Sequence, residues 1–173
     1  MIKTVVIDLD GVVADVDAAI SELLISRGLE DYDYSTWLSP DTDSTDAIEI
    51  YNNPLFWKNI KPFEDAWHQI NKWFSDAVDV YIISDRSNEQ SRSLIEPWLD
   101  GWKISSMVPI QAIYHSKSEV IEELDPDIVV DDNPIVVSNL LEKGINVFLK
   151  KTWYNRSSWS DLPTIDTLYD IKI

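Results

Sequence analysis

Residues 2–11 read Ile-Lys-Thr-Val-Val-Ile-Asp-Leu-Asp-Gly. The part of this stretch before its first acidic residue is almost uniformly apolar and β-branched, which is typical of a strand buried on both faces of a parallel sheet. Asp8 and Asp10 follow the apolar run, and Gly11 comes directly after them. Because ligands bind beyond the carboxyl ends of the strands in open α/β sheets, this stretch predicts both a parallel sheet and a site at its edge.

Further strand and helix patterns alternate along the rest of the chain. Short apolar runs occur at residues 78–83, 128–130 and 145–149, and apolar residues recur at helical spacing over residues 16–27, 63–74, 89–99, 118–124 and 135–143. Such alternation predicts right-handed βαβ units. The predicted fold class is therefore α/β, with a Rossmann-like parallel sheet that has helices on both faces.

The connection between the first two predicted strands is unusually long. About 70 residues separate them, which is far more than one crossover helix needs. We interpret residues 15–61 as a small, mainly helical cap inserted after the first strand, and residues 1–14 and 62–173 as the core domain. The total of 173 residues fits one domain with such an insertion.

Charge and composition exclude several classes of function. Lys and Arg total 14 against 31 Asp and Glu, a net charge of −17, so the chain would repel long duplex nucleic acid and anionic membranes. It has no cysteine, which excludes disulfides, thiolate metal sites and thiol nucleophiles. It shows no signal sequence and no run that approaches the roughly 18 apolar residues of a membrane span. We therefore expect a soluble, cytoplasmic protein.

Pairs of aspartates are common in this sequence, so their position decides which of them matter. Asp8 and Asp10 follow the first predicted strand, and Asp131 and Asp132 follow the strand at residues 128–130. Adjacent like charges repel one another, and a bound cation is the usual remedy. These four residues predict a Mg²⁺ site built from hard oxygen ligands, with positions left open for phosphate and water.

Two further residues suit a phosphate group. Ser84 ends the second predicted strand, where its hydroxyl could donate to a phosphate oxygen. Lys117 precedes a helical pattern, and because lysine is unfavourable near a helix N-terminus, a buried phosphate or carboxylate partner is expected. Asp8 could then attack phosphorus and form an aspartyl-phosphate. Asp10 could protonate the leaving oxygen and later deprotonate water.

The chain resembles the haloacid dehalogenase superfamily of phosphatases in the order of its motifs, which are Asp8-Leu9-Asp10-Gly11-Val12, Ser84, Lys117 and Asp131-Asp132. The resemblance implies a Rossmann-like core with a small helical cap after the first motif. It implies that Asp8 is the nucleophile, that Asp10 is the general acid and base, and that Ser84 and Lys117 bind the phosphate.

The same resemblance implies a Mg²⁺ cofactor and its ligands. The cation would be bound by Asp8, by the backbone carbonyl of Asp10 and by the pair Asp131 and Asp132. Of that pair, Asp132 would bind directly and Asp131 through a water molecule.

A closer resemblance is to the 5′(3′)-deoxyribonucleotidases. It rests on residues 8–15, on residues 55–62 and on Tyr154-Asn155-Arg156 after the last predicted strand. In that family a Phe-Trp pair lines the nucleoside pocket, which implies a substrate pocket at Phe56 and Trp57. Aromatic faces stack on bases, so the chemistry agrees. Packing between cap and core is the alternative role for both side chains.

Asp85 and Arg86 depart from the pattern of those enzymes, which usually have a small residue after the hydroxyl residue of the second motif. Arg86 could bind a second phosphate or a ribose, or it could pair with Asp85. Both residues are therefore included in the predicted substrate pocket.

The expected partner is a small phosphomonoester, most specifically a nucleoside monophosphate, and a homodimer is left open. Three alternatives compete with this function. A polynucleotide 3′-end phosphatase has the same motifs, but the net charge of −17 disfavours a long nucleic-acid track. A receiver domain that accepts phosphate for signalling has no place for the long insertion. An acidic mimic of DNA would spread its carboxylates over the surface and would not need them at strand ends.

Overall fold

A computed structural model describes residues 2–26, 56, 59–84, 93–104, 109–111 and 117–173. Within these residues, six strands form one sheet in the order β3-β2-β1-β4-β5-β6, and every neighbouring pair is parallel. The strands are β1 (Thr4–Asp8), β2 (Asp79–Ser84), β3 (Pro109–Gln111), β4 (Ile128–Asp131), β5 (Val147–Lys150) and β6 (Thr164–Ile165). The predicted α/β class and the parallel sheet are confirmed.

The register of the sheet brings the ends of three strands together. Asp8 lies in register with Ile83, so Ser84 follows at the next position of β2. β4 pairs with β1 on its other side and ends at Asp131. The strand order reverses between β1 and β4, and such a switch point is where open α/β sheets bind their ligands.

Alternate residues of the central strand pack on opposite faces of the sheet. Val5 and Ile7 belong to the larger apolar cluster, which includes Trp73 of helix α4 (Glu64–Ser75). Val6 belongs to a second cluster, which includes Ile121 of helix α7 (Lys117–Leu124). Because both faces of β1 are buried, its sequence reads as a continuous apolar run instead of an alternating one.

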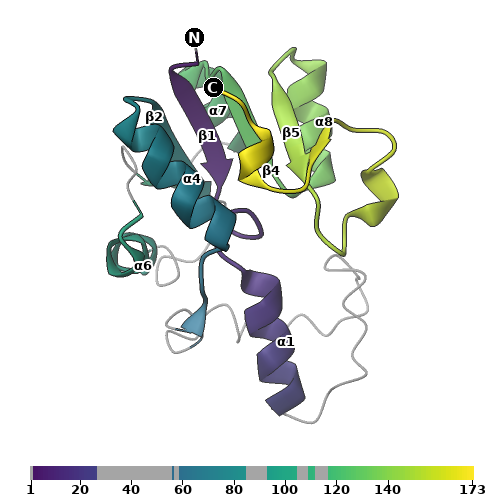
Figure 1. The fold of residues 1–173 in the computed structure, drawn as a ribbon. Coiled ribbons are helices and arrows are strands. Elements are labelled where there is room, and N and C mark those ends of the chain that lie inside the picture. Colours follow the sequence, from purple (N-terminus) through teal and green to yellow (C-terminus); the bar gives the residue numbers. More distant parts are fainter. Residues whose placement is uncertain (1, 27–55, 57–58, 85–92, 105–108, 112–116) are drawn as a thin grey trace.

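Five α-helices and two 3₁₀ helices accompany the sheet in the described part of the chain. They are α1 (Val16–Ser26), α4 (Glu64–Ser75), α6 (Ile95–Trp102), α7 (Lys117–Leu124), α8 (Pro134–Glu142), η1 (Arg156–Ser158) and η2 (Leu168–Asp170). Figure 1 shows α1 beyond the carboxyl end of β1, on the side toward which the strand points. None of these helices combines the length and the apolar character that a membrane crossing requires.

Helix α6 differs from its prediction. The sequence pattern predicts a helix over residues 89–99, whereas residues 93 and 94 form a turn and the helix spans Ile95–Trp102. Pro97 explains the difference, because a proline is tolerated in the first turn of a helix, where its missing N–H needs no partner. In the predicted helix the same proline would stand in the interior. The remaining predicted helices agree with the structure to within one residue at each described end.

The two ends of the predicted cap lie side by side. The backbone N–H of Asp15 donates to the carbonyl of Lys61 at 2.9 Å, and the N–H of Phe63 donates to the carbonyl of Val13 at 2.9 Å. The backbone before residue 16 is therefore hydrogen-bonded to the backbone at residues 61–63. Residues 27–55 lie outside the described residues, so the division into a cap at 15–61 and a core stays a prediction.

Candidate active site

Lys117 joins two carboxylates at the carboxyl edge of the sheet. Its Nζ lies 2.6 Å from Oδ1 of Asp8 and 2.6 Å from Oδ2 of Asp131. All three side chains are buried. These two carboxylates are the anionic partners that a lysine at the first position of a helix predicts.

Asp132 adds a third carboxylate to the same cluster. One oxygen from each of Asp8, Asp131 and Asp132 lies within 4.8 Å of the others. The Tyr154 hydroxyl donates to Oδ2 of Asp132, and Nδ2 of Asn155 donates to the backbone carbonyl of Asp132 at 2.8 Å. The side chain and the main chain of Asp132 are therefore both held from the segment that follows β5.

Burial and the charges of neighbouring carboxylates raise the pKa values of Asp8 and Asp132. The pKa of Asp8 is raised to about 7, first because the carboxyl is buried, and further by the charges of Asp131 and Asp10, while Lys117 opposes the change. The pKa of Asp132 is also raised well above its usual value, chiefly by burial. Burial by itself would lower the pKa of Lys117, but Asp131 and Asp8 together raise it. The lysine thus stays charged, whereas Asp8 and Asp132 hold protons more tightly than usual.

The residues of the cluster fit a divalent cation. Three buried carboxylates face one lysine, so their combined charge is not neutralised when all three are ionised. Carboxylate oxygens are the ligands that Mg²⁺ prefers. The raised pKa values of Asp8 and Asp132 reflect the free energy needed to ionise these two buried carboxyl groups without a cation.

The buried hydroxyl of Ser84 lies at this edge of the sheet. The residue is 2% exposed, and its Oγ has no hydrogen bond to any part of the chain that the structure describes. A buried polar group of this kind costs free energy unless a water molecule or a ligand satisfies it. The hydroxyl can therefore donate to an anion bound next to the cluster.

The remaining predicted site residues have different outcomes. Asp10 follows the end of β1, and its charge is one of those that raise the pKa of Asp8. Phe56 is 7% exposed and belongs to the larger apolar cluster. Trp57, Asp85 and Arg86 lie outside the described residues, so their place in a substrate pocket stays a prediction.

Tyr154 and Asn155 are site residues that the predicted site does not include. The sequence holds two signals for them. They belong to the Tyr154-Asn155-Arg156 stretch on which the resemblance to the deoxyribonucleotidases partly rests, and polar residues that follow a buried strand belong to the same edge of the sheet. The neighbouring Trp153 forms a hydrogen bond with Asp17 in the first turn of α1. Burial first, and then the charge of Asp15, raises the pKa of Asp17 to about 6.

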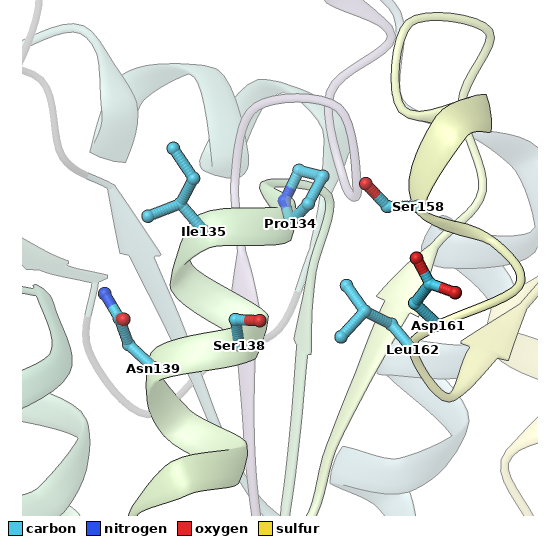
Figure 2. Close-up of a pocket in the computed structure, with 7 residues that line it drawn as sticks. All are labelled: Pro134, Ile135, Ser138, Asn139, Ser158, Asp161 and Leu162. Atoms are coloured by element: carbon cyan, nitrogen blue, oxygen red, sulfur yellow. The ribbon is translucent and has the colours of Figure 1, made fainter.

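A separate pocket lies between α8 and the segment after β5. It has a volume of about 310 Å³ and is lined by Pro134, Ile135, Ser138, Asn139, Ser158, Asp161 and Leu162 (Figure 2). No residue of the acidic cluster lines this pocket, and neither Ser84 nor Lys117 does. The pocket is therefore distinct from the candidate active site.

Comparisons with solved structures identify the fold. A "Putative haloacid dehalogenase-like hydrolase" from Bacteroides fragilis superposes with a TM-score of 0.62 at 14% identity, over 98% of this chain and 99% of the other. CbbY from Rhodobacter sphaeroides, solved with phosphate, gives 0.59 at 13% identity over 96% and 95% of the two chains. The chain has the haloacid dehalogenase fold.

The L-2-haloacid dehalogenase of Xanthobacter autotrophicus has the haloacid dehalogenase fold as well, with a TM-score of 0.56 at 16% identity over 93% of this chain and 84% of the other. In sequence, this chain is 25% identical over 139 residues to a Bacillus cereus protein named "Putative nucleotidase", which spans 70% of this chain and 71% of that protein. No family model matches the sequence. The strand order also differs from the order 2-1-3-4-5 of receiver domains, so a receiver fold is excluded.

Proposed function

We propose that this protein is a Mg²⁺-dependent phosphomonoesterase that hydrolyses nucleoside monophosphates through an aspartyl-phosphate on Asp8. One arrangement carries the proposal. Lys117 lies between Asp8 and Asp131, and the neighbouring strand ends at Ser84, whose hydroxyl has no hydrogen-bond partner among the described residues. A carboxylate nucleophile, a cation and a hydroxyl donor are the groups that a phosphoryl transfer needs beside one phosphate.

The proposed reaction has two steps. In the first, a carboxylate oxygen of Asp8 attacks phosphorus, the bond from phosphorus to the substrate oxygen breaks, and Asp10 gives that oxygen a proton. In the second, Asp10 takes a proton from water, the water oxygen attacks phosphorus, and the bond from phosphorus to Asp8 breaks. The products are an alcohol and inorganic phosphate, and both aspartates return to their starting states.

Lys117 and Ser84 each have a defined role in the proposed reaction. The Lys117 ammonium favours the ionised form of Asp8, which is the form that attacks, and it can also bind a phosphate oxygen. Ser84 supplies a hydrogen bond that no residue in the described ranges uses. Both groups therefore hold the phosphate against the nucleophile.

The Mg²⁺ ligands in this proposal are Asp8, the backbone carbonyl of Asp10, and the pair Asp131 and Asp132. When bound, Mg²⁺ would offset the negative charge of the cluster and of the phosphate, so that an anionic nucleophile can approach an anionic substrate. The close grouping of Asp8, Asp131 and Asp132 supports this assignment.

Two observations support a nucleotide substrate. The name of the Bacillus cereus relative is that of a nucleotidase, and residues 55–62 resemble the segment that lines the nucleoside pocket in deoxyribonucleotidases. In this proposal Phe56, Trp57, Asp85 and Arg86 line the nucleoside pocket, and residues 15–61 form the cap. A homodimer and a cytoplasmic location remain predictions of the sequence.

The test is phosphate release from a panel of substrates with Mg²⁺ and, separately, with EDTA. The panel contains dUMP, dTMP, dGMP, their 3′-isomers, the matching ribonucleotides, p-nitrophenyl phosphate and a DNA oligonucleotide with a 3′-phosphate. We expect Mg²⁺-dependent release that is fastest with mononucleotides. Preference for the oligonucleotide would favour a polynucleotide 3′-end phosphatase, and no release from any substrate would contradict the proposal.

A further inference from the structure

Two neighbouring residues after β5 donate hydrogen bonds to Asp132. The Tyr154 hydroxyl donates to Oδ2 of the Asp132 carboxylate. Nδ2 of Asn155 donates to the Asp132 carbonyl at 2.8 Å and to the Lys150 carbonyl at 2.9 Å. Asn155 thereby ties the end of β5 to the end of β4. The Tyr154 hydroxyl contacts the carboxylate of Asp132 and, at 3.4 Å, its backbone carbonyl as well.

The segment that carries these two residues is itself well anchored. Asn155 is 1% exposed, and its Oδ1 accepts hydrogen bonds from the backbone N–H of Thr152 at 3.0 Å and from Nε1 of Trp159 at 2.6 Å. The Tyr154 ring packs edge-to-face against Trp153, with 5.9 Å between the ring centroids. The Tyr154 hydroxyl is therefore presented to Asp132 from a rigid support.

The other side of the Asp132 carboxylate meets the first motif. A Cβ atom on Gly11 would lie 1.6 Å from Oδ2 of Asp132, which is the same oxygen that Tyr154 contacts. This oxygen is thus confined between the backbone of Gly11 and the hydroxyl of Tyr154. A carboxylate has two oxygens, and fixing one of them sets the plane in which the other is offered.

We propose that Tyr154 is a positioning residue for the cation site, which orients the Asp132 carboxylate toward the space that it shares with Asp8 and Asp131. The inference rests on the proposed metal-dependent function. Hydrogen bonds to metal-binding carboxylates fix their orientation, and their loss typically weakens metal affinity or activity 10–100-fold. A tyrosine that only fills space would contribute to folding and would leave metal affinity unchanged.

The test compares Tyr154→Phe with wild type in Mg²⁺ binding, measured by calorimetry on protein stripped with EDTA. The phenylalanine ring keeps the contact with Trp153 and removes only the hydroxyl, so the variant should fold. Tyr169→Phe is the matched control, because Tyr169 is 44% exposed and lies in η2, away from the cluster. We expect Mg²⁺ to bind Tyr154→Phe about 10–100-fold more weakly than wild type, and Tyr169→Phe to bind it like wild type.

A second measurement separates orientation from packing. The melting temperature of each protein is recorded in EDTA and at a series of Mg²⁺ concentrations, so that each variant serves as its own reference. We expect the Mg²⁺-dependent rise of Tyr154→Phe to require more metal. A lower melting temperature in EDTA with unchanged Mg²⁺ affinity would assign Tyr154 to packing and overturn the inference. If wild type bound no Mg²⁺, the metal-dependent function would fall as well, whereas equal affinities of wild type and Tyr154→Phe would overturn the inference alone.

Discussion

Gly11 and Asp132 approach so closely that no side chain fits between them. A Cβ atom on Gly11 would lie 1.6 Å from Oδ2 and 2.6 Å from Cγ of Asp132, and Gly11 has a φ of +78°. Both the contact and the backbone conformation require glycine. The turn after β1 and the turn after β4 are therefore fitted to each other at the candidate active site.

Gly11→Ala should destabilise the protein and weaken Mg²⁺ binding. The left-handed backbone conformation costs an alanine roughly 1–2 kcal/mol, and the new methyl group must displace the Asp132 carboxylate. Gly101→Ala is the control, because Gly101 lies in α6 and the added methyl group would meet no other described part of the chain within 4 Å beyond its own helix backbone and chain neighbours. Chemical denaturation should show Gly101→Ala at or above wild-type stability. Wild-type stability and Mg²⁺ affinity in Gly11→Ala would contradict the close approach.

Lys117→Met should lower stability strongly, by about 3–5 kcal/mol, because removal of one partner leaves buried carboxylates without their cation. The loss should be greater at pH 8 than at pH 5.5, since Asp8, with a pKa near 7, can take up a proton at the lower pH. The control is Lys143→Met, which breaks an exposed ion pair with Glu122 and should cost at most about 1 kcal/mol. Urea denaturation of both variants at the two pH values measures the difference. If Lys117→Met and Lys143→Met both lost the same small amount of unfolding free energy, the result would argue against a buried, charged Lys117.

The metal-free protein should lose stability as pH rises. The pKa of Asp8 is about 7 in the folded chain and near 3.8 in the unfolded chain, so between these values the folded state holds the extra proton. The folded metal-free protein is therefore most stable, as far as Asp8 is concerned, below about pH 4. This part of its stability is lost as pH rises through 7. Mg²⁺ competes with that proton, so the rise in melting temperature on adding Mg²⁺ should be larger at pH 8 than at pH 5.5. A Mg²⁺ effect that is independent of pH would contradict this linkage.

Trp57→Ala and Phe56→Ala should differ in their effects. Phe56 is buried in the larger apolar cluster, so its loss should cost about 3–5 kcal/mol of stability. If Trp57 stacks on the base, Trp57→Ala should lose roughly 1–3 kcal/mol of nucleotide binding, and kcat/KM for p-nitrophenyl phosphate should fall much less. Steady-state kinetics with dUMP and p-nitrophenyl phosphate, together with melting curves, test this. Equal losses for both substrates with a lower melting temperature would assign Trp57 to packing.

The sequence predicts the strands that have a long apolar run and misses the very short ones. Strands β1, β2, β4 and β5 are continuous apolar runs, because both faces of the sheet are covered. Strands β3 and β6 have three and two residues, too few for any hydrophobic pattern to register. Their places at the two edges of the sheet follow from pairing with β2 and β5, which is tertiary information.

The sequence predicts those residues of the candidate site that lie at the ends of strands or at the start of a helix. Asp8, Ser84 and Asp131 stand at the ends of strands, and Lys117 is conspicuous as a cation that begins a helix. The hydrogen bonds from Tyr154 and Asn155 to Asp132 span 22 and 23 residues. No local pattern encodes such contacts, because they depend on how the turn after β5 meets the end of β4.

The central claim is that Asp8 is the nucleophile of a phosphomonoesterase, and the most direct test is phosphate release by Asp8→Asn. Phosphate would be measured with a nucleoside monophosphate that wild type hydrolyses, at saturating Mg²⁺, with a melting curve to show that the variant is folded. The asparagine amide keeps the shape of the carboxyl group but lacks the charged oxygen that attacks phosphorus. We predict that turnover by folded Asp8→Asn falls by a factor of about 10⁴ or more. Turnover close to that of wild type would contradict the account.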